Sequence, residues 1–190
     1  MRTKCARERL ESAPLGGYDE PMQRAGIFLF LAVPAIALLA ASRPPDIPFK
    51  LQTLDIGAAE TAAIADVNRD GKPDILSGEY WYEAPTWKPH RYRELHFQNN
   101  YVDAFSDLPM DVDGDGWVDV ITATWFSKKV SWYRNPGAAG GAWKESNIVL
   151  GHNTEFAFLV DMDNDGKANE LLPQFGNQNA PTAWFENKGG

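Results

Sequence analysis

The chain has 190 residues, of which 44% are hydrophobic and 12% aromatic, so it has enough apolar side chains for a folded core and is not a disordered chain. Its formal net charge is −8, and because residues 1–42 carry a net charge of +1, all of the excess negative charge lies after Ser42. Such an acidic surface repels a phosphate backbone, which argues against a nucleic-acid partner and favours cations. The single cysteine, Cys5, excludes an internal disulfide from the rest of the chain.

An uncharged apolar segment, residues 25–41, lies between Arg24 and Arg43. It is near the lower length limit for crossing a bilayer, and Pro34 lies in its middle. Small residues at 40–42 form a plausible signal-peptidase site. We therefore predict an apolar helix here that acts as a signal peptide.

Residues 1–42 are interpreted as an N-terminal extension plus this signal, with Met22 as the start of the natural reading frame. The alternative is an uncleaved signal anchor, which would be the chain's one attachment to a membrane. Because no lipobox cysteine follows the segment, lipid anchoring is not supported. Both interpretations predict an exported protein that is secreted, periplasmic or on the cell surface.

The remainder, residues 43–190, contains a threefold internal repeat. Three Asp-rich segments align without a gap: IADVNRDGKPDILSG (64–78), PMDVDGDGWVDVITA (109–123) and LVDMDNDGKANELLP (159–173). Each is followed by an aromatic pair: Trp81-Tyr82, Trp132-Tyr133 and Trp184-Phe185. Each is preceded by an aromatic residue and a lysine: Phe49-Lys50, Trp87-Lys88 and Trp143-Lys144. The predicted repeats cover about 49–86, 87–142 and 143–190.

The pattern inside each repeat predicts β-structure. Directly after each Asp-rich segment comes a short apolar pair, too brief for a helix: Ile75-Leu76, Val120-Ile121 and Leu171-Leu172. Residues 129–133 alternate between polar and apolar side chains, as a half-buried strand does. Several short strands separated by turns indicate an all-β array such as propeller blades.

The Asp-rich loops follow the pattern D-x-[DN]-x-D-G-x-x-[DN], which places oxygen ligands at alternate positions. The candidate side-chain ligands are Asp66, Asn68, Asp70 and Asp74; Asp111, Asp113, Asp115 and Asp119; and Asp161, Asp163, Asp165 and Asn169. The backbone carbonyls of Lys72, Trp117 and Lys167 would add a ligand at position seven. Calcium takes six to eight such oxygens, so the sequence predicts three calcium sites. With four carboxylates, the second loop is expected to bind most tightly.

Two other interpretations of the loops are an EF-hand and an ordinary polar turn. An EF-hand requires a glutamate at position twelve and flanking helices, whereas Ser77, Thr122 and Leu172 stand there. Ordinary polar turns also contain Asp, Asn and Gly. Three copies in one register, each leading into a strand, favour metal loops over ordinary turns.

The DVDGDGWVDVITA and VSWYRNPG stretches resemble the FG-GAP or VCBS repeat family, and the resemblance covers about residues 49–190. It implies a β-propeller of antiparallel four-stranded blades with calcium in the loops between strands. We therefore expect a partial propeller of three blades. Three blades do not close a ring, so self-association or missing blades are expected as well.

This resemblance implies a binding or adhesion module for carbohydrate or extracellular protein ligands, with calcium in a structural role. The aromatic pairs are expected in the blade cores rather than as sugar-stacking platforms. The alternative function is a fragment of a carbohydrate-active enzyme of the sugar lyase or dehydratase type. Its candidate acid/base residues would be Glu60, Asp103, His152 and Glu155, which precede the Asp loops.

Overall fold

The computed structural model describes residues 47–189. The chain divides into two units, residues 1–51 and 52–190, and the described part of the first, residues 47–51, contains no helix or strand. Within residues 47–189, no helix is long and apolar enough to cross a membrane. The apolar helix predicted at 25–41 lies outside the described residues.

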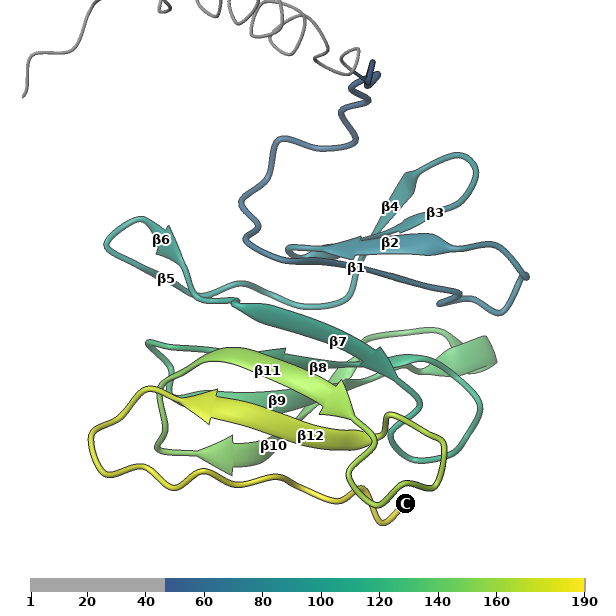
Figure 1. The fold of residues 1–190 in the computed structure, drawn as a ribbon. Coiled ribbons are helices and arrows are strands. Elements are labelled where there is room, and N and C mark those ends of the chain that lie inside the picture. Colours follow the sequence, from purple (N-terminus) through teal and green to yellow (C-terminus); the bar gives the residue numbers. More distant parts are fainter. Residues whose placement is uncertain (1–46, 190) are drawn as a thin grey trace, which may run out of the picture. The chain divides into compact units, whose positions relative to one another are not determined.

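The second unit is built almost entirely from antiparallel strands, which confirms the all-β prediction (Figure 1). The first sheet has the order β1-β2-β3-β4. Its strands are β1 (Ala62–Ala65), β2 (Asp74–Ser77), β3 (Tyr80–Glu83) and β4 (Lys88–Arg91). The first Asp loop is the connection between β1 and β2, and a pair of bulky cross-strand partners, Ile75 and Tyr82, fixes the β2–β3 register.

The second sheet repeats this arrangement with the order β10-β9-β8-β7. Its strands are β7 (Ser106–Met110), β8 (Asp119–Ala123), β9 (Lys129–Arg134) and β10 (Lys144–Leu150). The second Asp loop connects β7 to β8, and the short 3₁₀ helix η1 (Gly137–Ala139) lies between β9 and β10. A small hairpin of β5 (Phe97–Gln98) and β6 (Tyr101–Val102) lies between the two sheets along the chain.

The third repeat differs from the four-stranded blade that was predicted. It forms a two-stranded sheet of β11 (Thr154–Val160) and β12 (Glu170–Phe175), extended by one bridge between Leu171 and Phe185. The third Asp loop connects β11 to β12. The described residues thus contain two four-stranded sheets and one shorter sheet, and none of them closes into a barrel.

The sequence repeat and the sheet are offset by one strand. Strands β4 and β10 begin at Lys88 and Lys144, next to the aromatic residues that open the second and third sequence repeats. Nevertheless β4 pairs with β3, and β10 pairs with β9. The second and third sequence repeats therefore each supply the last strand of the preceding sheet, which links consecutive sheets covalently.

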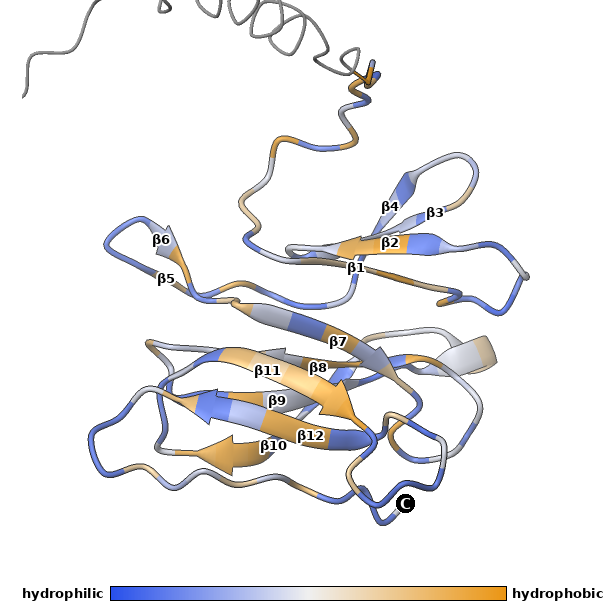
Figure 2. Ribbon diagram, viewed as in Figure 1, coloured by the Kyte–Doolittle hydropathy of each residue, from blue (hydrophilic) through white to orange (hydrophobic). Residues whose placement is uncertain are grey.

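The second sheet is the middle layer of the core. Successive residues of a strand point to opposite faces, so Val120 and Ile121 on β8 belong to two different apolar clusters. Val120 packs with Leu76 and Tyr133 between the first two sheets, and Ile121 packs with Leu171 against β11 and β12. Figure 2 shows apolar residues along β8, β11 and β12 in this region.

A buried ion pair also joins the first two sheets. Arg93, which follows β4, forms a salt bridge of 2.7 Å with Asp107 on β7. Its guanidinium also donates to the Gly78 carbonyl at 2.7 Å and to Thr122 Oγ1 at 2.8 Å. These bonds satisfy an arginine that is 6% exposed, which is why such a polar side chain is tolerated between two sheets.

The aromatic pairs are only partly the core residues that we expected. Tyr82 and Tyr133 are buried, and Trp81 packs against the cluster between the first two sheets. Trp184 in the third repeat is 42% exposed. Because the third sheet is shorter, no fourth strand covers its aromatic pair as in the other two repeats.

Candidate metal centre

All three Asp loops adopt the same backbone path. The aspartate at position one accepts the N–H of the glycine at position six, over 3.0, 2.9 and 3.0 Å in the three loops. These glycines are Gly71, Gly116 and Gly166, with left-handed φ angles of 83°, 87° and 89°. A residue with a side chain adopts such angles only at a cost in free energy. The loops are therefore pre-bent by local bonds that the sequence pattern itself encodes.

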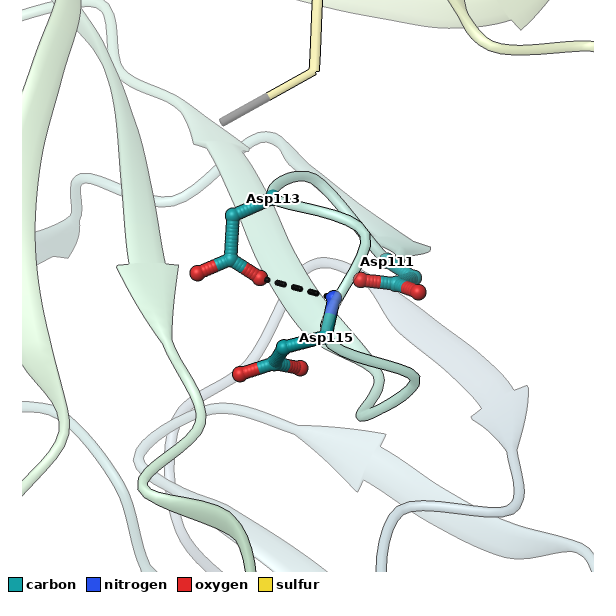
Figure 3. Close-up of side chains that lie close together, drawn as sticks. All are labelled: Asp111, Asp113 and Asp115. Carbon is teal, nitrogen blue, oxygen red and sulfur yellow. Dashed lines mark hydrogen bonds between the residues drawn. The ribbon is translucent and has the colours of Figure 1, made fainter.

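The acidic side chains of the second loop converge. Carboxylate oxygens of Asp111, Asp113 and Asp115 lie within 4.8 Å of one another, and Figure 3 shows the three groups gathered around the turn. One of the Asp113 oxygens accepts the Asp115 N–H at 3.3 Å. Asp111 Oδ1 is a buried atom without a hydrogen-bond partner among the described residues. A buried carboxylate oxygen without a donor is unfavourable, and a bound cation would satisfy it. The residues of this loop thus fit a hard cation.

The acidic cluster of the third loop overlaps the predicted ligand set only in part. Carboxylate oxygens of Asp161, Asp163 and Glu170 lie within 4.8 Å of one another. Glu170 was missed because it stands at position ten of the loop, one residue after Asn169. In the orientation that satisfies its neighbours, the Asn169 amide donates to Glu170 Oε1 at 2.7 Å. Asn169 therefore orients Glu170. The sequence feature that could have identified Glu170 is an acidic residue at the start of an apolar strand.

The aspartates at position nine lie beneath their loops and anchor the backbone. Asp119 is fully buried, and its two oxygens accept the Val112 N–H at 3.1 Å and the Asn135 N–H at 2.7 Å. Asp74 makes the equivalent bonds to Val67 and Ala84 in the first repeat. Burial raises the pKa of Asp119, whereas the two backbone bonds favour its charged form. These carboxylates hold each loop against the end of the third strand.

The first loop is the least acidic of the three. Its position-three residue is Asn68, whose Oδ1 accepts the Asp70 N–H at 3.1 Å. The ammonium of Lys72 lies 2.7 Å from Asp70, and this hydrogen bond lowers the pKa of the Asp70 carboxyl. With one carboxylate paired and one replaced by an amide, the first loop is the weakest candidate for a cation.

A guanidinium lies across the second loop. Arg134 Nε is 2.6 Å from Asp113, and another nitrogen of the same group is 3.1 Å from Asp115. The charge of Asp113 is the main cause of the raised pKa of Arg134. Arg69 lies over the Trp117 ring of the same loop, 5.4 Å from its centroid. The prediction that the second loop binds calcium most tightly counted its four carboxylates but not the positive charges of Arg134 and Arg69 beside them.

Of the four acid/base candidates, Asp103 and His152 each have surroundings of their own, whereas Glu60 and Glu155 share a neighbour. Asp103 is 2% exposed, and its carboxylate accepts the N–H groups of residues 125, 126 and 127 over 2.7 to 2.9 Å. His152 stacks on Phe175 at 4.4 Å. Glu60 and Glu155 both lie near Tyr101, and the hydrogen bond to Glu60 is the main cause of the raised pKa of this phenol. Asp103 thus anchors a loop and His152 packs against an aromatic ring.

Comparison with known proteins gives one match. Residues 111–171, from the second Asp loop to the start of β12, match the family model of the FG-GAP-like repeat. For residues 111–171 this match confirms the FG-GAP resemblance that the Asp loops predicted. No curated protein and no solved structure matches the chain significantly.

Proposed function

Because residues 111–171 form an FG-GAP-like repeat, we propose that this chain is an exported β-repeat binding module whose Asp loops hold structural calcium. The observation that carries the proposal is the cluster of Asp111, Asp113 and Asp115, with a buried oxygen of Asp111 that lacks a donor. Calcium prefers such carboxylate and carbonyl oxygens, and accepts the irregular geometry of a loop.

Two loops have the acidic residues to hold an ion. In the second loop these are Asp111, Asp113 and Asp115, with the Trp117 carbonyl as the predicted fourth contact. In the third loop they are Asp161, Asp163 and Glu170. A bound calcium ion supplies positive charge that offsets the repulsion between carboxylates held this close. The loops connect the first two strands of their sheets, so an ion there stabilises strand pairing.

The expected stabilisation is modest but useful. Extracellular calcium modules have dissociation constants of roughly 10⁻⁴–10⁻³ M. At millimolar calcium, a site at the tight end of that range adds about 1.4 kcal/mol to the free energy of unfolding. Residues 43–190 contain no cysteine, so calcium would take the reinforcing role that disulfides have in many exported domains.

A binding function is better supported than an enzymatic one. The carboxylate of Asp103 is occupied by three backbone N–H groups, so the sugar lyase or dehydratase alternative loses one of its acid/base candidates. The ligand class on the binding proposal is a carbohydrate or an extracellular protein. Export is proposed from the apolar segment at 25–41.

The direct test is terbium luminescence in the full chain. Terbium replaces calcium at oxygen sites, and Trp117 at position seven of the second loop is placed to transfer excitation to the ion. We expect luminescence that calcium removes and that Asp113→Asn weakens strongly. Asp55→Asn is the matched control, because Asp55 lies outside the loops and accepts the Tyr82 hydroxyl. If added calcium does not lower the terbium luminescence, or if Asp113→Asn and Asp55→Asn give equal luminescence, the proposal is contradicted.

A further inference from the structure

A cavity of about 280 Å³ lies between the first two sheets, outside the carboxylate clusters. One side is formed by β3 and β4 through Trp81 and His90, and the other by the second Asp loop and the β9–β10 connection through Trp117 and Trp143. The first Asp loop adds Asn68. Cavities that hold small ligands measure roughly 300–1,000 Å³, so this one suits a compact molecule of one or two rings rather than a long peptide.

The walls of this cleft are aromatic and held in place. Trp81 and His90 are cross-strand partners whose rings stack in parallel, 4.2 Å apart and inclined by 10°. Glu83 fixes the imidazole through a hydrogen bond of 2.7 Å to Nε2. Trp143 packs against Tyr92, and a Cβ atom on Gly137 would lie 2.8 Å from the Trp117 ring. His90 covers one face of Trp81 and Arg69 lies over the Trp117 ring, so these indoles line the cavity with the apolar surface that stays uncovered and with their N–H donors.

The charged groups around the cleft favour a neutral ligand over a charged one. No carboxylate lines the cleft among the described residues, although the chain as a whole is strongly acidic, so a cationic ligand finds no ion-pair partner there. The Trp117 ring, which could attract a cation, already has Arg69 over it at 5.4 Å. The one permanent cation in its lining, Arg91, already pairs with Glu79 at 3.0 Å, which disfavours an anion. A saccharide fits what remains, because its C–H face packs on an indole and its neutral hydroxyl groups bond to amides and ring N–H groups.

Two walls of the cleft belong to the Asp loops. Asn68 is position three of the first loop, and Trp117 is position seven of the second. The Asn135 amide ties these walls together by donating to the carbonyls of Val67 and Val118 at 3.1 and 3.0 Å. An ion that orders the second loop therefore also orders the wall that carries Trp117, and ligand and ion must then favour each other's binding.

We infer that this cleft, lined by Trp81, His90, Trp117 and Trp143, binds a neutral saccharide unit and that calcium in the Asp loops strengthens the binding. This inference extends the proposed binding function by naming the ligand class and the binding site. The saccharide part stands on the cleft itself, whereas the calcium dependence rests on the proposed metal loops.

The test uses the full chain on an array of neutral mono- and disaccharides, uronic acids and amino sugars, followed by calorimetry on the neutral sugar that binds best. In millimolar calcium we expect binding to neutral sugars in preference to charged ones. Trp81→Leu should weaken it by roughly tenfold or more, because stacking area is lost. His90→Ala is the second variant, since Trp81 also packs against the core and its replacement affects folding. Trp184→Ala, which removes an exposed indole of the third repeat, should bind like the parent chain.

Each outcome separates the cleft from the metal loops. If no neutral sugar binds while calcium still raises the melting temperature, the cleft inference fails and the calcium proposal stands. If sugar binds but both Trp81→Leu and His90→Ala bind equally well, the saccharide site lies elsewhere and the inference fails. Chelator should weaken sugar binding at least about fivefold, and equal binding in calcium and chelator would overturn the coupling.

Discussion

Replacing Asp119 by asparagine separates the anchoring role of position nine from metal binding. The two carboxylate oxygens of Asp119 accept backbone N–H groups of Val112 and Asn135 in a fully buried position. Asn keeps the size of the side chain but turns one acceptor into a donor, so one N–H group loses its partner. An unsatisfied buried donor costs roughly 1–3 kcal/mol. Asp119→Ala removes both acceptors and should cost about 2–5 kcal/mol by the same reasoning.

Urea unfolding in the presence of chelator measures this effect without calcium. We expect Asp119→Asn to lower the free energy of unfolding by roughly 1–3 kcal/mol with an unchanged slope. The control is Asp115→Asn, an exposed carboxylate of the same loop, which should stay within about 0.5 kcal/mol of the parent chain in chelator. If Asp119→Asn unfolds like the parent chain in chelator, the anchoring role is refuted.

Three further predictions follow from the packing and charges. Arg134→Gln should tighten calcium binding at the second loop roughly two- to fivefold, measured by terbium competition, because two carboxylates lose a competing guanidinium; unchanged affinity would contradict this. Leu76→Ala should lower the free energy of unfolding by about 2–5 kcal/mol, since Leu76 is fully buried, whereas Ile56→Ala at a 96% exposed position should leave it nearly unchanged. Burial raises the pKa of Tyr133 to about 12, so the proton is retained longer in the folded state and stability should fall as pH rises from about 10 to 12. Tyr133→Phe should reduce that fall in alkaline urea titrations, and an identical pH profile in the variant would refute the assignment.

Local features of the fold were predictable from the sequence because neighbouring residues determine them. The turn at Gly116 and the bonds from Asp111 arise within six residues, so the D-x-D-x-D-G pattern is sufficient to predict them. Val120 and Ile121 were placed on a strand for the same reason, and alternation then sends them to opposite faces.

Features that depend on distant parts of the chain were not predictable. Arg93 reaches Thr122 and Asp107 across a sheet interface, and a lone arginine in a loop gives no sign of this. Glu170 joins the acidic cluster of the third loop because β12 begins at Glu170, one residue later in the repeat than β2 and β8, which a gapless alignment hides. Arg134 lies in the VSWYRNPG stretch that carries the family resemblance, but the sequence does not mark it as a partner of the loop aspartates, since strand pairing sets that distance.

The most direct measurement of the central claim is a thermal melt of the full chain in millimolar calcium and in chelator, alone and with Asp113→Ala and Asp115→Ala combined. The account predicts a melting temperature that rises with calcium in the parent chain and a smaller rise in the double variant, whose third loop is intact. An equal melting temperature in calcium and chelator would contradict it, because the Asp loops would then be ordinary turns.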